Sequence, residues 1–138
     1  MKLTLHHINL ATENVARMDN FYQEVMGLSP NVAGLPVLEK KQGYAGDVAF
    51  VSDGHLQMHL AQKDVLAGFN AGQMVNPVAR GHIAYRRDDL AAFKAHLRAQ
   101  NIPFSDWVNK AVSGWHQIFF YDPDGNVIEV HEVQDTAD

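Results

Sequence analysis

The sequence predicts an α+β fold made of two similar modules, each a strand, a helix and three further strands. Apolar and polar patterning gives this order of elements twice within 138 residues. His7-Ile8 recurs 75 positions later as His82-Ile83, and Leu56–His59 recurs 72 positions later as Ile128–His131. A repeated unit this small cannot close a core alone, so we expect the two copies to pack together as one domain over 1–138.

The first module is expected over about residues 1–61. Alternation predicts a strand over Lys2–Thr12, and helical spacing predicts a helix over Glu13–Met26, capped by Asn14 and stopped by Gly27. The expected apolar stripe of this helix is Val15, Met18, Phe21, Tyr22 and Val25. Three strands should follow, the last two joined by the tight turn Asp53-Gly54: Asn31–Lys41, Asp47–Ser52 and His55–Ala61.

The second module is expected over about residues 79–133, after a linker or irregular cover segment over 62–78. Its first strand is predicted over Arg80–Arg87, and an aspartate-capped helix over Asp88–Gln100. Leu90, Ala91, Phe93, Ala95 and Leu97 supply the apolar face of that helix. Three strands should follow, with Asp122–Gly125 as the turn between the last two: Pro103–Asn109, Gly114–Tyr121 and Asn126–Val133.

Composition narrows the classes of protein. Hydrophobic residues make up 46% and charged residues 20%, as in folded soluble domains, and no apolar run is long enough to span a membrane. There is no signal peptide pattern and no cysteine, so we expect neither disulfides nor thiolate metal sites, and a cytoplasmic location. The net charge of −5, with only Lys40-Lys41 and Arg86-Arg87 as basic pairs, argues against a nucleic-acid partner.

Strand alternation places the candidate metal-binding and catalytic residues on one face of the sheet. In the first strand Leu5, His7 and Asn9 share a face, and His6, Ile8 and Leu10 share the other, which should pack on the helix. The same reasoning turns a further set toward the concave side of the sheet: Gln57, His59, His82, Ala84, Arg86, Glu129 and His131.

Two imidazoles and a carboxylate on this face suit a divalent metal and leave positions for water or substrate. The candidates are His7, His82 and Glu129, and Glu129 sits in the apolar run Val127–Val130, where a carboxylate is costly unless paired or metal-bound. The alternative is that these residues only satisfy one another by hydrogen bonds inside the fold. A surface or hydrogen-bonded role is expected for the other histidines, His6, His55, His96 and His116.

Several short motifs in order resemble the glyoxalase / bleomycin-resistance / extradiol-dioxygenase superfamily, the vicinal oxygen chelate proteins. They are His7–Leu10, Phe21-Tyr22, Gly27-Leu28, Gly81–Ala84 and Phe120–Asn126 leading to Ile128-Glu129, and the resemblance covers Leu5–Val133. It implies a cup-shaped, mixed sheet of two paired βαβββ modules. It also implies metal ligands at His7, His82, Gln57 and Glu129, of which the three-ligand members use the positions of His7, His82 and Glu129.

The resemblance implies a divalent-metal-dependent, glyoxalase-like enzyme of lyase, isomerase or epimerase type, acting on a small substrate with vicinal oxygens. The metal would be Zn, Ni, Mn, Co or Fe. Glu129 would be a ligand and proton shuttle, and His59 or His131 would support the ligands or act as acid–base groups. Asn9 and Arg86 would contact substrate, and the alternative for Arg86 is a solvated residue at the strand end. The alternatives are an Fe(II) extradiol-type dioxygenase and a non-catalytic module that binds a small molecule or antibiotic.

Two positions depart from the glyoxalases within that family. Those enzymes usually have glutamate where this chain has Gln57, and a glutamine cannot act as a general base. Their glutathione-binding arginine would fall at Ala11, whereas methylmalonyl-CoA epimerases look similar at all four ligand positions. Family members are commonly dimers, and we expect a homodimer with Phe50, Val51, Trp107 and Trp115 as candidates for the apolar contact.

Overall fold

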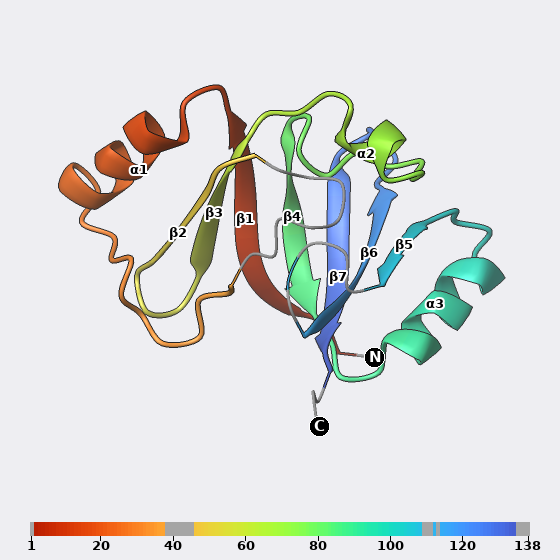
Figure 1. The fold of residues 1–138 in the computed structure, drawn as a ribbon. Coiled ribbons are helices and arrows are strands. Elements are labelled where there is room, and N and C mark those ends of the chain that lie inside the picture. The colour runs from red at the N-terminus through yellow and green to blue at the C-terminus, as the bar shows by residue number, and fades with distance from the viewer. Residues whose placement is uncertain (1, 38–45, 109–111, 113, 135–138) are drawn as a thin grey trace.

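The computed structural model describes residues 2–37, 46–108, 112 and 114–134. In these residues seven strands form one open sheet, in the order β2-β3-β1-β4-β7-β6-β5, accompanied by three helices (Figure 1). The elements are β1 Thr4–Thr12, α1 Val15–Glu24, β2 Val48–Ser52, β3 Gln57–Gln62, α2 Ala67–Asn70, β4 Gly81–Arg86, α3 Leu90–Ala99, β5 Ser105–Val108, β6 Trp115–Tyr121 and β7 Val127–Val133. The predicted α+β class with a mixed sheet is confirmed.

The two halves of the chain meet at the centre of the sheet, where β1 and β4 run antiparallel. Ile8 lies opposite Ile83, and these two residues occupy the same place in the repeat. The halves are therefore related by a local twofold axis between β1 and β4. On either side of that axis β1 pairs with β3, and β4 with β7, in parallel. This brings His7 and His82 close together from positions far apart in the sequence.

The two longer helices lie at opposite ends of the sheet, α1 beside β2 and β3, and α3 beyond β5 (Figure 1). The predicted caps are confirmed, because the Asn14 side chain accepts from the Arg17 amide and Asp89 accepts from the Ala92 amide. Helix α3 buries Leu90, Phe93 and Leu97 in a cluster with Ile118, Phe120 and Val130.

The apolar faces of both helices are narrower than expected. Ala91 and Ala95 of α3 are exposed, and Phe21 and Val25 at the end of α1 are 46% and 67% exposed. Each helix covers only one end of the sheet, so a single stripe of side chains contacts it and the flanking apolar positions stay in water.

The predicted strand over Asn31–Lys41 is wrong where it can be followed. Residues 31–37 form no strand, and residues 38–45 lie outside the described part of the chain. Pro36 lacks the amide donor that a ladder needs, and Gly34 has a φ of +89°, which breaks extended backbone. The expected linker is irregular apart from the short helix α2, whose Ala67 packs against Ala61 and Val78.

The residues predicted for a dimer contact lie inside the fold. Val51, Trp107 and Trp115 are buried and Phe50 is half-buried, and Trp107 packs with Val75 and Phe119. Their selection as surface contacts is therefore wrong, because these strand residues pack inside the fold.

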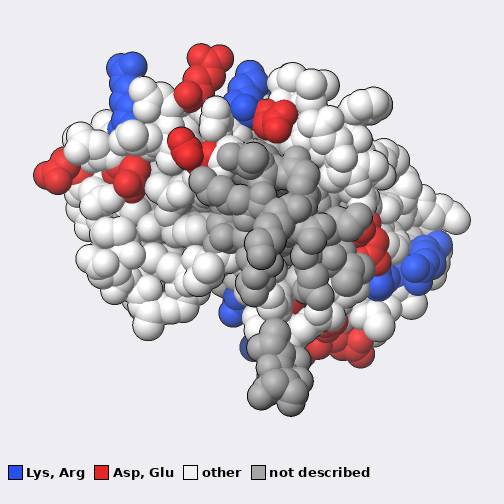
Figure 2. Space-filling model, viewed as in Figure 1, with Lys and Arg blue, Asp and Glu red and all other residues white. Residues whose placement is uncertain are grey.

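The described residues on the face that Figure 2 shows form no long basic stripe. Among the described residues there, lysine and arginine side chains lie in small groups with acidic side chains nearby. None of the helices in the described part of the chain is long and apolar enough to cross a membrane.

Candidate metal centre

A β-bulge in β1 shapes the centre of the concave face. Leu5 pairs with Tyr85 and His7 with Ala84, so His6 is an extra residue without a partner on β4. The alternation therefore breaks, and His6 joins His7 on the concave face, with its ring 4.8 Å from that of His131 and 5.2 Å from Trp115. The prediction that His6 shares the opposite face with Ile8 and Leu10 is wrong, because the pattern contains no signal for the inserted residue.

Three buried side chains converge beside the twofold axis. Glu129 Oε1 lies 3.1 Å from His82 Nε2 and 3.6 Å from His7 Nε2. Atoms bound to one ion at about 2.1 Å with angles of 90–109° are about 3.0–3.4 Å apart, so these separations suit a single divalent cation. All three side chains are at most 8% exposed, and their ligand atoms lie within 4.8 Å of one another.

The hydrogen bond of His82 to Pro77 directs its other ring nitrogen, Nε2, at Glu129. The Nδ1–H group of His82 donates to the Pro77 carbonyl oxygen at 2.7 Å. In a neutral imidazole the Nε2 atom then presents a lone pair to the carboxylate oxygen of Glu129, which repels it unless a cation or proton lies between them. The donor set and its orientation fit a divalent metal of borderline hardness, held by His7, His82 and Glu129.

Glu129 is held ionised. Burial alone would raise its pKa, but the nearby His7 and hydrogen bonds from His131, His7 and His82 outweigh burial and keep the pKa well below the usual range. The Nδ1–H group of His131 donates to Oε2 at 2.7 Å, and the Gln117 amide donates to Oε1 at 3.2 Å. The carboxylate is therefore fixed in position with its charge directed at the two histidines.

His7 has a partner of its own on the far side of its ring. Its Nδ1 atom lies 2.8 Å from Nδ1 of His6. Burial, followed by the positive charge of Arg86, lowers the pKa of His6 to about 3, and burial also lowers the pKa of His7. The His6 ring is therefore neutral at neutral pH and can accept a hydrogen bond. When the Nε2 lone pair of His7 binds a metal, the Nδ1–H group of His7 donates to His6.

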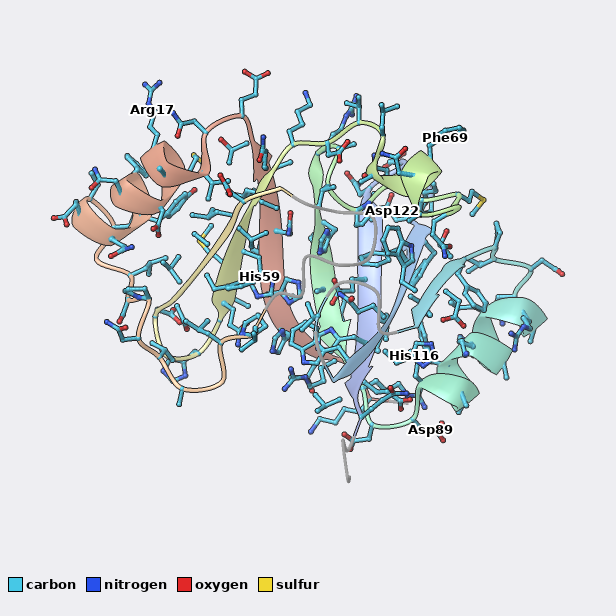
Figure 3. The ribbon with its side chains drawn as sticks, viewed as in Figure 1. Arg17, His59, Phe69, Asp89, His116 and Asp122 are labelled. Atoms are coloured by element: carbon cyan, nitrogen blue, oxygen red, sulfur yellow. The ribbon has the colours of Figure 1, made fainter. Side chains whose placement is uncertain are left out.

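His59 and Gln57 form a separate hydrogen-bonded pair. The Nε2–H group of His59 donates to the Gln57 side-chain oxygen at 2.8 Å, and the Gln57 amide nitrogen donates to the Gly34 carbonyl oxygen at 3.0 Å. The His59 ring stacks on His7 with 3.7 Å between centroids, and burial lowers its pKa well below the ordinary value. Figure 3 shows His59 in front of β3 and β1.

The strand pairing shows which residue of β3 corresponds to Glu129 of β7 in the repeat. Ile8 pairs with Met58 and Ile83 with Ile128, so equivalent positions of β3 and β7 are 70 residues apart (128 − 58) rather than 72. By this register His59 corresponds to Glu129. The structural equivalence of Gln57 with Glu129 is therefore wrong, and ligation by Gln57 remains a prediction.

Arg86 supports the carboxylate rather than lining the cavity. Its Nε–H group donates to His131 Nε2 at 3.0 Å, and its guanidinium lies 5.3 Å from the Trp115 ring centroid. His131 stacks on Trp115 at 4.0 Å. Arg86, His131 and Glu129 thus form one chain of hydrogen bonds, in which both nitrogens of His131 are engaged.

A cavity of about 60 Å³ adjoins the metal candidates, enough for a few water molecules or a ligand of a few heavy atoms. Asn9 and His59, both predicted on this face, line it together with apolar Phe50, Val78 and Phe119. Gln57, Arg86 and His131 are not among the described residues that line it. Five residues that the sequence predicted on one face do line the same cavity, namely His7, Asn9, His59, His82 and Glu129.

Among the described residues of the site, two acceptor atoms lack hydrogen-bond partners. Asn9 Oδ1 and Gln117 Oε1 are buried without a hydrogen bond, although both residues line the cavity. An unpaired buried acceptor costs about 1–3 kcal/mol, so each of these oxygens favours a donor from a ligand or a water molecule. Gln117 and His6 were missed as site residues. Every residue of β6 from Trp115 to Phe120 is buried, so alternation there could not distinguish the two faces.

Comparison with solved structures shows the same fold. The chain matches a hypothetical protein from Bacillus halodurans C-125 with a TM-score of 0.70 and 17% identity, over 100% of this chain and 99% of that one. It matches Streptomyces coelicolor methylmalonyl-CoA epimerase in complex with 2-nitronate-propionyl-CoA with a TM-score of 0.68 and 21% identity, over 96% and 99%. Methylmalonyl-CoA epimerase from Mycobacterium tuberculosis gives a TM-score of 0.66 and 20% identity, over 94% and 87%.

No curated protein sequence matches the chain. A family model does match, over residues 4–130, and it spans both halves of the sheet and all three metal candidates. The chain therefore belongs to the Glyoxalase/Bleomycin resistance protein/Dioxygenase superfamily.

Proposed function

We propose that this protein is a divalent-metal-dependent enzyme of lyase, isomerase or epimerase type that acts on a small substrate with vicinal oxygens. The observation that carries the proposal is the convergence of His7, His82 and Glu129 on one point, with the Nδ1–H group of His82 held by Pro77. A divalent ion bound there supplies Lewis acidity, which polarises substrate oxygens.

The residues around the ligands divide between orientation and proton transfer. His131 and His6 orient Glu129 and His7, and His131 has no nitrogen left to exchange a proton with substrate. His59 lines the cavity as a neutral imidazole, with Nε2–H held by Gln57. We therefore assign the acid–base role to His59 rather than His131, with Glu129 as ligand.

The structural neighbours favour this class over ring cleavage. The neighbours include methylmalonyl-CoA epimerases with the same fold, and the Streptomyces coelicolor protein is bound to 2-nitronate-propionyl-CoA. These likenesses support isomerase or epimerase chemistry here as well.

The second candidate is an Fe(II) dioxygenase, because two histidines and one carboxylate with open positions are also the donor set of non-haem iron oxygenases. Metal-free protein loaded in turn with Zn²⁺, Mn²⁺, Co²⁺, Ni²⁺ and Fe²⁺ separates the two. We expect one metal per chain by elemental analysis, and metal-dependent exchange of carbon-bound hydrogen for deuterium in small hydroxy-carbonyl compounds, followed by NMR.

The other outcomes of this experiment have distinct meanings. Oxygen uptake only with iron would favour the dioxygenase. Binding of small molecules without any metal uptake would favour a non-catalytic module, and would overturn the proposed function.

We further propose that the protein is a homodimer. Four large apolar side chains of the segment around α2 are more than half exposed, namely Val65, Leu66, Phe69 and Met74. Figure 3 shows Phe69 on α2 at the margin of the molecule. Several exposed apolar residues in one short segment are typical of an interaction surface. The cytoplasmic location remains a prediction.

A further inference from the structure

We propose that Asn9 and Gln117 are specificity-determining residues that accept hydrogen bonds from a hydroxyl-bearing ligand, so that the cavity selects α-hydroxy carbonyl compounds. This inference rests on the proposed function, since the ligand shares the cavity with the metal candidates. The inference goes beyond the proposed function because it names the group on the ligand that the protein recognises.

The first observation is the state of two amide oxygens. Asn9 is 7% and Gln117 4% exposed, and neither Oδ1 of Asn9 nor Oε1 of Gln117 has a hydrogen-bond partner. The orientation of the Gln117 amide is fixed independently, because its nitrogen donates to Glu129 Oε1. Its oxygen must therefore point elsewhere, and it remains an acceptor without a donor.

The second observation is where these residues lie. Asn9 is directly opposite His82 in the β1–β4 ladder, and Gln117 bonds the carboxylate of Glu129. Both residues line the cavity that His7, His82 and Glu129 also line. A ligand whose oxygens face the metal candidates therefore lies beside the two amide side chains.

The apolar residues of the cavity explain why a hydroxyl donor on the ligand would be recognised. Val48, Phe50, Val78 and Phe119 are apolar and offer no competing hydrogen bond. Among the described lining residues none is lysine or arginine, and the tryptophan and arginine nearby are engaged with His131. Acceptors in an apolar, small cavity discriminate strongly against a ligand that leaves them unpaired.

The test compares hydroxyacetone with methoxyacetone, which keeps both oxygens but has no hydroxyl hydrogen. Binding to Zn²⁺-loaded protein is measured by calorimetry for the wild type, Asn9→Leu, Gln117→Met and the control Asn20→Leu, an exposed asparagine on α1. We expect wild type and the control to prefer hydroxyacetone by about tenfold or more. The preference should fall at least severalfold in each of the two cavity variants.

The unfolding midpoint of the metal-free proteins gives a second readout. Replacing an unpaired buried amide by an apolar side chain of similar size should raise the midpoint in Asn9→Leu while the ligand preference is lost. Equal binding of the two ketones to wild type, or an undiminished preference in both variants, would overturn the inference. Zinc uptake is measured in the same samples, and its failure would instead overturn the proposed function.

Discussion

At the scale of single residues, His6 shows how one inserted position changes the chemistry of a site. The bulge turns it to the concave face, where it meets Nδ1 of His7 at 2.8 Å. A hydrogen bond to the second nitrogen of a metal-binding histidine fixes the ring and its tautomer, and losing such a bond typically costs 10–100-fold in affinity. His6 is therefore a positioning residue for His7.

We predict that His6→Ala lowers zinc affinity by about 10–100-fold, measured by competition with a chelator. His6→Gln keeps an acceptor on the side chain and should recover part of the loss. His55→Ala is the matched control, because that histidine is exposed. Equal affinities in wild type and His6→Ala would show that His6 does not orient the ligand.

The residue scale also shows what alternation can and cannot predict. His7, Asn9, His82 and Glu129 were placed correctly, since the alternation is regular from His7 onward in β1 and along β4 and β7. His6 was misplaced because a bulge leaves no mark in the apolar pattern. Gln117 was missed because β6 is buried on both faces.

At the scale of elements, the junction of β1 and β4 depends on Gly81. It has a φ of +105°, and a Cβ atom there would lie 2.1 Å from the Asn9 carbonyl oxygen. No side chain fits without moving the central ladder that carries His82 and Asn9.

We predict that Gly81→Ala lowers the free energy of unfolding by about 2–4 kcal/mol, measured with denaturant, since backbone strain and a steric clash act together. Gly54→Ala is the control, because its φ of +98° is similar but its Cβ would meet nothing within 4 Å. That variant should lose only about 1–2 kcal/mol. Similar losses in both would mean that strain alone, and not close packing of β1, requires the glycine.

The contact between α3 and the sheet edge has its own pH dependence. Burial alone would raise the pKa of Asp106, but hydrogen bonds from His116 at 2.6 Å and Lys94 at 3.0 Å lower it below the ordinary value. A carboxyl with a depressed pKa in the folded state stabilises the protein above its unfolded pKa of about 3.9, and this contribution is lost as pH falls through the folded pKa.

We therefore predict that Asp106→Asn is less stable than wild type at pH 6, and that the difference shrinks as pH falls below about 4. Urea unfolding followed by circular dichroism at a series of pH values measures this. A difference that is independent of pH would assign the effect to packing rather than to the charged hydrogen bonds.

Element boundaries were predicted well where one face is apolar and the other polar, as in β4 and β7, and least well in the segment after α1. There the apolar residues of 31–37 alternate like a strand, but Gly34 and Pro36 prevent ladder hydrogen bonds. The register of β3 on β1 could not be predicted from the sequence either. A register shift of two residues leaves every side chain on the same face, so the apolar pattern does not change.

At the scale of the whole molecule, the repeat predicted the organisation around the twofold axis, but it did not identify the outer surface. Apolar residues such as Trp107 and Trp115 are needed by the core, whereas the segment around α2, which has no periodic pattern, exposes the apolar patch. Composition alone cannot tell these two uses of an apolar side chain apart.

We predict a homodimer by light scattering at micromolar concentration, and a shift toward monomer in Phe69→Asp, since Phe69 is 82% exposed in the single chain. Tyr121→Asp is the control, because Tyr121 is also exposed, at 44%, but belongs to β6. A monomeric wild type would contradict the assembly, and a dimer unaffected by Phe69→Asp would place the interface elsewhere.

The central claim, a metal held by His7, His82 and Glu129, is tested most directly by metal affinity across a ligand series. We predict that His7→Ala, His82→Ala and Glu129→Ala each lose more than the about 10–100-fold expected for an orienting partner, while Gln57→Ala, whose amide is already bonded to His59 and Gly34, loses less. Circular dichroism of the metal-free proteins verifies that each variant is folded. Wild-type affinity in Glu129→Ala, with loss only in Gln57→Ala, would contradict this ligand set, and loss of folding in all three variants with no metal ever bound would show that these residues only satisfy one another inside the sheet.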